Sequence, residues 1–303
     1  MDPIEPSRGV GALLGTFTGD ALGMPFEGRD HRGIPVEIEM EESRLGRGTY
    51  TDDTQMMIAL AESLVACGRV EEEHLAATFL DLFDPERGYG RGTREVLTRW
   101  RSGESVSTAA RQLFDGTGSR GNGAAMRIAP VAVRFAADRE RLLDEAERSA
   151  RLTHAHPVGV DAAVVQAAAI VAALGGEDIL AVARQAADTD ELRRALDRTA
   201  ELAVPSAKPS QVHRELGSSS DACESVSASI CSAVANGSFE DAVRFAIRLG
   251  GDTDTTAAMT GAIAGAREGA EGIPSRWLRV LEDGPRGRSH VERLGEQLVA
   301  ARA

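Results

Sequence analysis

Apolar residues in this chain recur at the three- and four-residue spacing of α-helices. Met56, Met57, Leu60 and Leu64 form one such stripe, and a second follows 162–174. Alternating runs bounded by hairpin dipeptides are scarce, and aromatic residues make up only 4% of the sequence. Because strands need that alternation and favour aromatic side chains, a sheet-built core is disfavoured. We therefore expect an all-α fold.

Small residues are frequent within the predicted helices. Ala257, Gly261 and Gly265 lie four residues apart, a spacing that lets two helix backbones approach closely. No low-complexity linker divides the sequence, so we predict one compact multi-helix domain over 1–303. Within it, 28–50 combines glycine, proline and many charges and is predicted to be a mobile surface loop. The polar stretch 205–220 is predicted to be a long connection.

The charge balance limits the classes of partner. Lys and Arg number 34 against 47 Asp and Glu, a net charge of −13, which argues against a general nucleic-acid surface. The three cysteines fall in small-residue or apolar stretches and are predicted to be reduced thiols, as in the cytoplasm. The N-terminus has no basic leader, and 162–174 contains Gln166 and is short for a bilayer. We expect a cytoplasmic protein, outside the membrane and monomeric by default.

Two acidic motifs are the strongest functional signal. They are Thr51-Asp52-Asp53-Thr54 and Asp252-Thr253-Asp254-Thr255, each followed by a helix-compatible run. Both motifs are explained as helix caps if their side chains accept hydrogen bonds from the first free amides. One capping residue is enough for a helix, however, and a second acid adds repulsion unless a cation or base lies nearby. The repetition therefore favours a shared site for magnesium or manganese, which prefer oxygen ligands.

Three further motifs can contribute to a site. Gly118-Ser119-Arg120-Gly121-Asn122-Gly123 precedes a predicted helix start, where its amides form either an anion-binding concavity or a tight turn. His154 and His156 flank Ala155 just before Pro157, and we predict a polar substrate contact for His154 and a structural role for His156. Glu27 stands at the entrance to the predicted loop, where a carboxylate can act as general acid, general base or gate.

Taken in order, these segments resemble the ADP-ribosylglycohydrolase family. The matching segments are Gly19-Asp20-Ala21-Leu22-Gly23 with Glu27, Thr51-Asp52-Asp53-Thr54, Gly88-Tyr89-Gly90, Gly121-Asn122-Gly123-Ala124-Ala125-Met126-Arg127, Thr153-His154 and Gly250-Gly251-Asp252-Thr253-Asp254-Thr255. The final stretch continues through 259–266 and is most similar to the branch that removes ADP-ribose from serine.

This resemblance implies an all-α fold with two magnesium or manganese ions at the base of a cleft. The implied metal ligands are Thr51, Asp52, Asp53, Asp252, Asp254 and Thr255. The implied catalytic residues are Glu27, Asp53 and Asp252, and the implied substrate-binding residues are Gly118, Ser119, Gly121, Asn122, Gly123, His154, Tyr89 and Gly90. Arg120 stands where the serine-specific relatives carry an aromatic residue that helps to sandwich adenine.

The resulting hypothesis is a metal-dependent hydrolase that cleaves at C1″ of ADP-ribose. Its substrates are expected to be ADP-ribosylated protein side chains, serine more than arginine, or small ADP-ribose conjugates. One alternative is a binuclear-metal hydrolase of nucleotide pyrophosphates, because hard metals and a glycine anion loop also serve phosphoryl chemistry. Another is a non-catalytic ADP-ribose binder, which ranks last because all the matched acids and Glu27 are present.

Overall fold

The computed structural model describes residues 5–301, and within them the chain forms helices and no β-strand. The all-α prediction is confirmed. The α-helices are α1 (Pro6–Gly23), α2 (Asp52–Cys67), α3 (Glu72–Leu82), α4 (Arg91–Arg101), α5 (Val106–Ala109), α6 (Ala129–Phe135), α7 (Arg139–Arg151), α8 (Pro157–Gly175), α9 (Ile179–Ala186), α10 (Asp190–Leu202), α11 (Pro209–Leu216), α12 (Ala222–Ala235), α13 (Phe239–Ile247), α14 (Thr253–Glu268), α15 (Ser275–Leu278) and α16 (Arg288–Ala300). The 3-10 turns are η1 (Met24–Phe26), η2 (His31–Gly33), η3 (Pro85–Arg87), η4 (Ala110–Gln112), η5 (Asn122–Ala124) and η6 (Ala270–Gly272).

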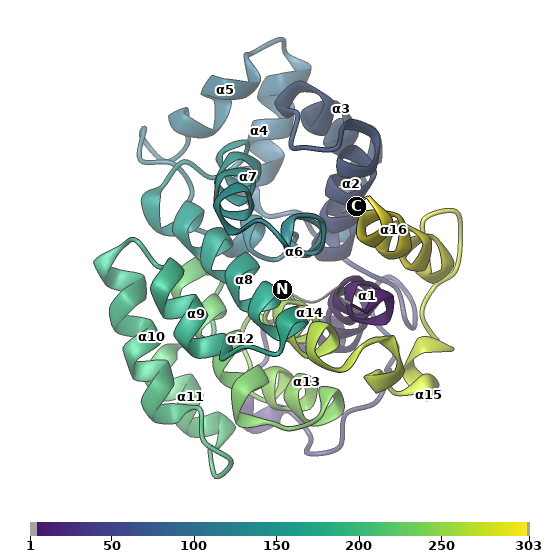
Figure 1. The fold of residues 1–303 in the computed structure, drawn as a ribbon, viewed down its shortest axis with the longest axis vertical. Helices are drawn as coiled ribbons and strands as arrows, with labels where there is room; N and C mark the ends of the chain where they lie inside the picture. The colour runs from purple at the N-terminus through teal and green to yellow at the C-terminus, as the bar shows by residue number, and fades with distance from the viewer. Residues whose placement is uncertain (1–4, 302–303) are drawn as a thin grey trace.

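The helices surround a central group made of α1, α8 and α14. Figure 1 shows α2 to α7 on one side of this group and α9 to α13 on the other, with α16 beside α1 and α2. One continuous apolar core joins the two sides, and a small second cluster lies under α11. The site described below opens between elements from both sides.

Close backbone contact between α1 and α14 is the central packing feature. A Cβ atom on Gly15 would lie 2.0 Å from the carbonyl oxygen of Gly261, and one on Gly19 would lie 2.1 Å from that of Ala257. No larger side chain fits at either glycine, so the predicted close approach of small residues is confirmed. At the end of this contact, Gly23 lies against Asp254, where a Cβ atom would come within 2.5 Å of the Asp254 Cα. The packing thereby fixes one acidic motif against the end of α1.

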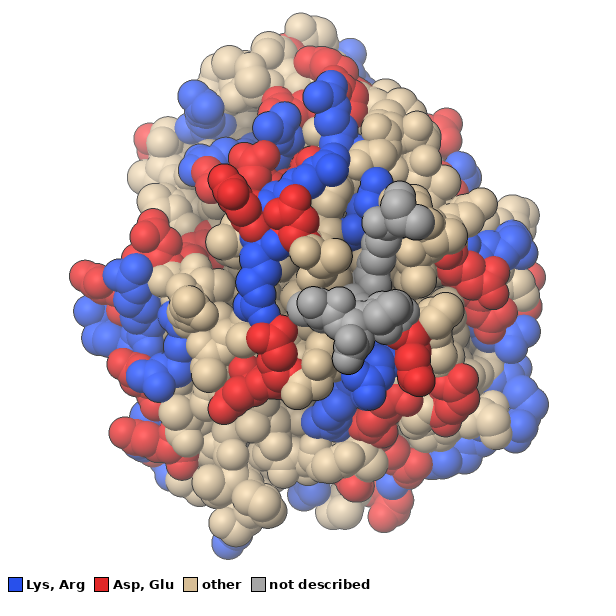
Figure 2. Space-filling view, in the orientation of Figure 1, with Lys and Arg blue, Asp and Glu red and all other residues tan. Residues whose placement is uncertain are grey.

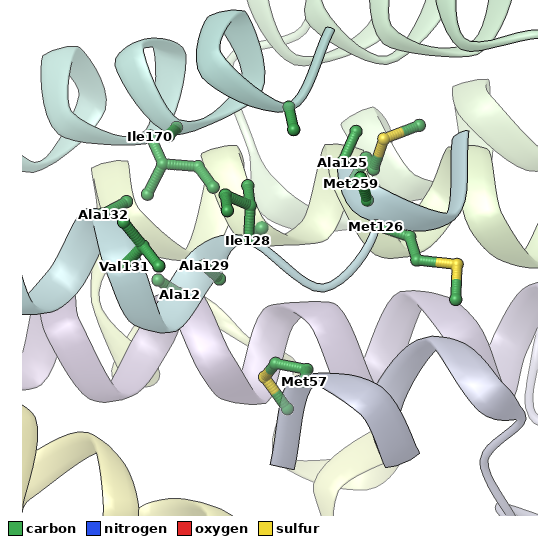
Figure 3. Packing of buried hydrophobic residues seen from close by; sticks show 14 of the residues in the cluster. Ala12, Met57, Ala125, Met126, Ile128, Ala129, Val131, Ala132, Ile170 and Met259 are labelled. Carbon is green, nitrogen blue, oxygen red and sulfur yellow. The ribbon is translucent and has the colours of Figure 1, made fainter. Parts of the chain in front are cut away.

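Short side chains also fill the space between α1 and α8. Figure 3 shows Ile128, which lies just before α6, and Val131, which lies within α6, between Ile170 of α8 and Ala12 of α1. Met57 of α2 is fully buried in the same core, as its place in the apolar stripe predicts. The core therefore begins immediately behind the first acidic motif.

Helix α8 is long and apolar enough, by length and composition, to cross a membrane. In this fold 89% of its most apolar window is buried, among α7, α9, α12 and α14. The prediction of a buried core helix is confirmed. The helix extends beyond 162–174 because Pro157 occupies its first turn and His156 Nδ1 accepts a hydrogen bond from the Val158 amide.

The prediction of a long connection over 205–220 is wrong, because this stretch contains α11. Pro209 starts the helix, and Val212 and Leu216, four residues apart, are buried in the second apolar cluster. These two side chains supply the tertiary packing that a short helix needs. The polar composition of 205–220 gives no indication that these two side chains are buried.

The segment 28–50 is attached to the domain at several points. The Gly28 amide donates to the Gly251 carbonyl at 2.8 Å, Trp277 Nε1 donates to Glu39 at 2.7 Å, and Ile38 and Met40 are buried. Between these attachments, only short stretches of the segment lack a buried side chain. The mobility of the segment stays a prediction.

Charged side chains of both signs are intermixed on the face seen in Figure 2. Ion pairs between surface side chains of the described residues include Arg139 with Glu177 and Arg151 with Glu147. This face therefore presents no extended basic surface of the kind that binds nucleic-acid backbones.

Candidate active site

A cleft of about 1080 Å³ opens where α2, α14, the turn after α1 and the glycine-rich loop before α6 meet. Most of the predicted site residues line it. Those that do are Glu27, Asp52, Asp53, Asp252, Asp254, Thr255, Gly90, Gly118, Ser119, Gly121, Asn122, Gly123 and His154. Thr51 and Tyr89 lie behind the lining.

The two acidic motifs form the floor of the cleft at the starts of α2 and α14. Thr51 caps α2, its hydroxyl accepting from the Asp53 amide at 3.3 Å. Asp252 occupies the N-cap position of α14 but makes no side-chain cap. Its carboxylate instead accepts a hydrogen bond from Asn122 Nδ2 at 2.8 Å. Capping therefore uses a threonine in the first motif and leaves the carboxylates of both motifs available to the cleft.

Asp20 of α1 holds the first acidic motif in place, a role that the sequence did not reveal. This fully buried carboxylate accepts hydrogen bonds from the amide and hydroxyl of both Thr51 and Thr54, at 2.6 to 3.1 Å. Burial raises its pKa to about 6, against the opposing effect of these hydrogen bonds. All the groups that it faces are donors, which an ionised carboxylate can accept. The only signal in the sequence is its position between Gly19 and Ala21 in a helix of small residues.

The carboxylates of the floor repel one another. Burial, followed by the charges of neighbouring acids, raises the pKa of Asp52 to about 8 and those of Asp53 and Asp254 well above the usual range. Asp252 is among the neighbours responsible in all three cases. Such a concentration of buried negative charge is relieved by protons or by a cation.

Glu27 faces the same floor from the turn after α1. Burial and the charge of Asp252 raise its pKa, while Arg44 acts in the opposite direction. Arg44 lines the cleft from the segment 28–50 and donates a hydrogen bond to the Glu86 carbonyl. Nothing near Arg44 in the chain indicates that it faces the acids, so its place in the site is not evident from the sequence. Glu27 is thus a carboxyl at the cleft surface whose pKa is raised, and a carboxyl so placed can exchange a proton with a bound ligand.

The donor set of the floor fits a hard divalent cation. Its atoms are carboxylate oxygens with the Thr255 hydroxyl, and Asp53 Oδ1 is buried with no hydrogen-bond partner. The other oxygen, Asp53 Oδ2, accepts from Thr51 at 3.1 Å and Thr255 at 3.2 Å. Within 5–301, no three His, Cys, Asp or Glu side chains converge closely enough to hold an ion as they are placed. The type and burial of the oxygen donors fit magnesium or manganese.

The glycine-rich loop forms the opposite wall. Gly118 has φ of 76°, and a Cβ atom there would lie 2.5 Å from the His156 amide nitrogen, so only glycine fits. Gly121 forms an isolated antiparallel bridge with Asp221, and the Asn122 amide donates to the Ser220 carbonyl at 3.1 Å. The predicted helix after this loop is only the 3-10 turn η5, since α6 begins later, at Ala129. The wall therefore offers turn amides and no helix dipole.

The two predicted histidines take different positions. His156 caps α8, in agreement with its predicted structural role. His154 is buried beside Gly121 and Gly123 and lines the cleft. Burial, and secondarily the charge of Arg127, lowers the pKa of His154 to about 3. Its imidazole is therefore neutral at physiological pH.

Tyr89 lies behind the cleft lining, and its predicted contact with substrate stays a prediction. The Tyr89 side chain is buried, its hydroxyl donates to Gln55 Oε1 at 2.8 Å, and its ring meets Phe83 edge-on. These contacts hold the turn that carries Gly88 and Gly90. Tyr89 consequently positions the cleft wall from behind.

The outer rim contains Arg120 and an exposed aromatic residue. Arg120 Nε and Nη2 each lie 2.6 Å from a carboxylate, of Asp221 and Glu191 respectively, which fixes the guanidinium at the rim. Phe114 also lines the cleft, with 48% of its surface exposed and a left-handed φ of 51°. Sequence analysis missed Phe114, because an isolated aromatic residue in a polar loop carries no distinguishing pattern.

The chain matches the ADP-ribosylglycohydrolase family over residues 1–303. It is 33% identical to ADP-ribosylhydrolase ARH3 of Xenopus tropicalis, over 96% of this chain and 95% of that protein. It is 28% identical to the ADP-ribosyl-[dinitrogen reductase] glycohydrolase of Rhodospirillum rubrum, over 92% of both chains.

The fold agrees with these relationships. A solved structure described as an ADP-ribosylglycohydrolase-related protein complex superposes with a TM-score of 0.81 at 30% identity, covering 98% of this chain and 99% of the other. Sequence and fold thus point to the same group of enzymes over the full length. The chain belongs to the ADP-ribosylglycohydrolase family of hydrolases.

Proposed function

We propose that this enzyme releases ADP-ribose from ADP-ribosylated protein side chains or small conjugates by hydrolysis at C1″. The observation that carries the proposal is the meeting, in one cleft, of an acidic floor with a wall of turn amides and a neutral histidine. Membership of the family supports the same reaction. The preference for serine over arginine conjugates is part of the proposal and rests on the similarity of the stretch 250–266 to the serine-specific branch.

The floor is proposed to hold two magnesium or manganese ions. The residues that would hold them are Asp52, Asp53, Asp252, Asp254 and Thr255, with Thr51 directly behind Asp53. Bound there, the ions would supply Lewis-acid stabilisation and orient the ribose hydroxyls and a water molecule. Asp20 keeps the first motif in register through Thr51 and Thr54.

Glu27 is the proposed proton-transfer residue. In the reaction the bond from C1″ to the departing oxygen or nitrogen breaks and the leaving atom gains a proton from the carboxyl, while the water oxygen bonds to C1″ and gives up one proton, which restores the protonated carboxyl. A carboxyl whose pKa is raised by burial and Asp252 retains a proton more readily at neutral pH and can deliver it. Glu27 lines the cleft, where the charges of Asp252 and Arg44 act on it, and we propose that it contacts the leaving group.

The opposite wall is proposed to bind the ADP portion. The Gly121 and Asn122 amides already donate to Ser119 Oγ and to the Ser220 carbonyl, so the Gly123 amide is the one proposed to face the phosphate oxygens. His154 lies against this turn. Phe114 offers an exposed ring on which a base can stack. The Arg120 guanidinium, held by two carboxylates, offers a second flat surface at the rim.

Mass-spectrometric product analysis tests this proposal. The enzyme, supplied with magnesium or with EDTA, is incubated with matched peptides carrying ADP-ribose on serine or on arginine. We expect intact ADP-ribose and unmodified peptide in magnesium, with faster release from the serine peptide. AMP with a ribose-5-phosphate remnant on the peptide would instead identify a pyrophosphate hydrolase, and binding without any product would identify a non-catalytic binder.

Replacing Glu27 with Gln separates its role from ligand binding. We expect release to slow by about 100-fold or more, because the proton donor is lost, while ADP-ribose affinity measured by calorimetry stays within about threefold. Glu86→Gln is a matched control, since its exposed carboxylate lies outside the cleft lining. Full activity of Glu27→Gln would remove Glu27 from the mechanism.

A further inference from the structure

Arg127 is a buried cation without a carboxylate partner. The residue is 0% exposed, its guanidinium lies over the Phe79 ring, and no Asp or Glu in the described part of the chain forms an ion pair with it. Its Nη1 donates to the Gly123 carbonyl, and its Nη2 donates to the Ser149 carbonyl and to Thr153 Oγ1, each at 2.9 Å. Buried charges are ordinarily paired. Here the positive charge lies directly under the glycine turn of the cleft.

Thr153 connects Arg127 to His154 through hydrogen bonds. Its hydroxyl oxygen is 2.8 Å from His154 Nδ1 and already accepts from Arg127, which can only donate. The Thr153 hydroxyl hydrogen has no other acceptor in the described structure, and the residue is fully buried. If Nδ1 carried a proton, this hydrogen would be left unbonded at a cost of about 1–3 kcal/mol. Thr153 therefore donates to Nδ1, and the proton of the neutral ring is on Nε2.

The Nε2 edge of His154 faces the cleft. A Cβ atom on Gly123 would lie 3.3 Å from Nε2, and one on Gly121 would lie 3.8 Å from it. Over 5–301 no protein group forms a hydrogen bond with Nε2. An N–H donor therefore points along the glycine turn with its acceptor still to be supplied.

We infer that Arg127 and Thr153 are positioning residues that make this end of the cleft a receptor for a diphosphate oxygen. Arg127 supplies buried positive charge beneath the turn and orients the Gly123 carbonyl away from the ligand. Thr153 fixes His154 as an Nε2–H donor toward the same oxygen. The inference rests on the proposed function, because it takes the ADP portion of the substrate as the ligand of this wall.

The protonation states agree with this geometry. Burial lowers the pKa of Arg127 to about 9, so the guanidinium is still charged at pH 7. The pKa of His154 is lowered to about 3. The pair is thus a cation and a neutral donor, and the ring does not add a second charge.

Nitrogen NMR of histidine-labelled, ligand-free protein tests the tautomer independently of any activity. We expect the His154 signal, assigned with His154→Gln, to show Nε2 protonated and Nδ1 unprotonated. Thr153→Val should lose this preference, and Thr153→Ser, which restores the hydroxyl, should recover it. Thr199→Val is the matched control, because Thr199 is equally buried but bonds only within α10. A wild-type ring protonated on Nδ1 would overturn the inference, even if Thr153→Val does not fold.

Calorimetric titration with ADP-ribose, and with adenosine as the phosphate-free probe, tests the receptor. Thr153→Val should bind ADP-ribose about tenfold more weakly, with adenosine affinity unchanged and with Thr153→Ser and Thr199→Val close to wild type. An altered tautomer with unchanged ADP-ribose affinity would overturn the inference. The wild-type protein could show the expected tautomer and still fail to bind ADP-ribose. That result would overturn the proposed function and the receptor, but not the hydrogen bonds from Arg127 to Thr153 and from Thr153 to His154.

Discussion

The two sides of the cleft carry charge of opposite sign. The floor gathers Asp52, Asp53 and Asp254, whose pKa values are raised by burial and mutual repulsion. The glycine wall lies over the unpaired guanidinium of Arg127 and presents a neutral His154. An anionic ligand is thus attracted by one side and repelled by the other until the floor is neutralised.

The construction of the two sides differs in the same way. The floor is carried by the starts of two long helices, which α1 locks together through backbone contact and through Asp20. The wall is a turn held by a side chain from below and by the bridge to Asp221. The floor thus concentrates negative charge at the starts of two packed helices, and we propose that a cation neutralises it, whereas the positive charge under the wall comes from a protein side chain.

Removing an acid from the floor should have the largest effect. We expect Asp254→Ala to slow ADP-ribose release by at least about 1000-fold, because cation binding and transition-state stabilisation are lost together. Turnover and magnesium or manganese binding by calorimetry provide the measurement. Asp188→Ala, which changes an acid that is 95% exposed, is the control. A fully active Asp254→Ala enzyme would contradict the metal-dependent account.

Disturbing the support of the floor should have a smaller effect. Asp20→Asn replaces an acceptor oxygen with an amide that faces the donors of Thr51 and Thr54. We expect the free energy of unfolding to fall by about 1–3 kcal/mol and release to slow about tenfold. Asp161→Asn is a matched control, since Asp161 is also buried and accepts from Thr189 outside the cleft. It should lose stability and retain turnover, whereas equal activity losses would mean that Asp20 acts only on stability.

The wall should respond to pH differently from a titrating site. His154→Gln should weaken ADP-ribose binding about tenfold, and by the same factor at pH 5.5 and pH 8, because the pKa of His154 is lowered to about 3. Below about pH 6.5 the His154 imidazole of the unfolded chain binds a proton, whereas the buried imidazole of the folded chain stays neutral. Neutral burial of His154 therefore lowers the free energy of unfolding as pH falls from 6.5 toward 3 and has no effect above that range. A binding difference that changes near pH 6.5 would show that the ring titrates in the fold.

The smallest effect is expected at the rim. Arg120→Met removes ion pairs to Glu191 and Asp221 from a side chain that is 43% exposed, so stability should change by less than about 1 kcal/mol. If the guanidinium covers a base, ADP-ribose affinity should fall about threefold. Arg184→Met, which removes a similarly exposed ion pair with Asp197, is the control. Equal affinities for the two variants would exclude Arg120 from the ligand site.

Sequence reasoning reached the parts of the site that lie in local motifs. The acids of both tetrads, Glu27 and the glycine loop line one cleft, as the resemblance implied. Asp20 lies in a segment that matches the family, but its role in holding the first acidic motif was not predicted, and Arg44 and Phe114 were not singled out at all. These roles arise from contacts between distant segments. Helix α11 was not predicted for the same reason. Its Val212 and Leu216 are recognised as buried residues only once the other members of the second apolar cluster are seen to pack against them.

The most direct test is the dependence of ADP-ribose release on divalent cation. The enzyme is stripped with EDTA and assayed on the serine-ADP-ribose peptide before and after magnesium or manganese is restored, with ADP-ribose binding followed in parallel. We predict that release stops on chelation and returns with the cation, while the wall retains measurable affinity for ADP-ribose. Equal rates of release in EDTA and in magnesium would contradict the proposed role of the acidic floor.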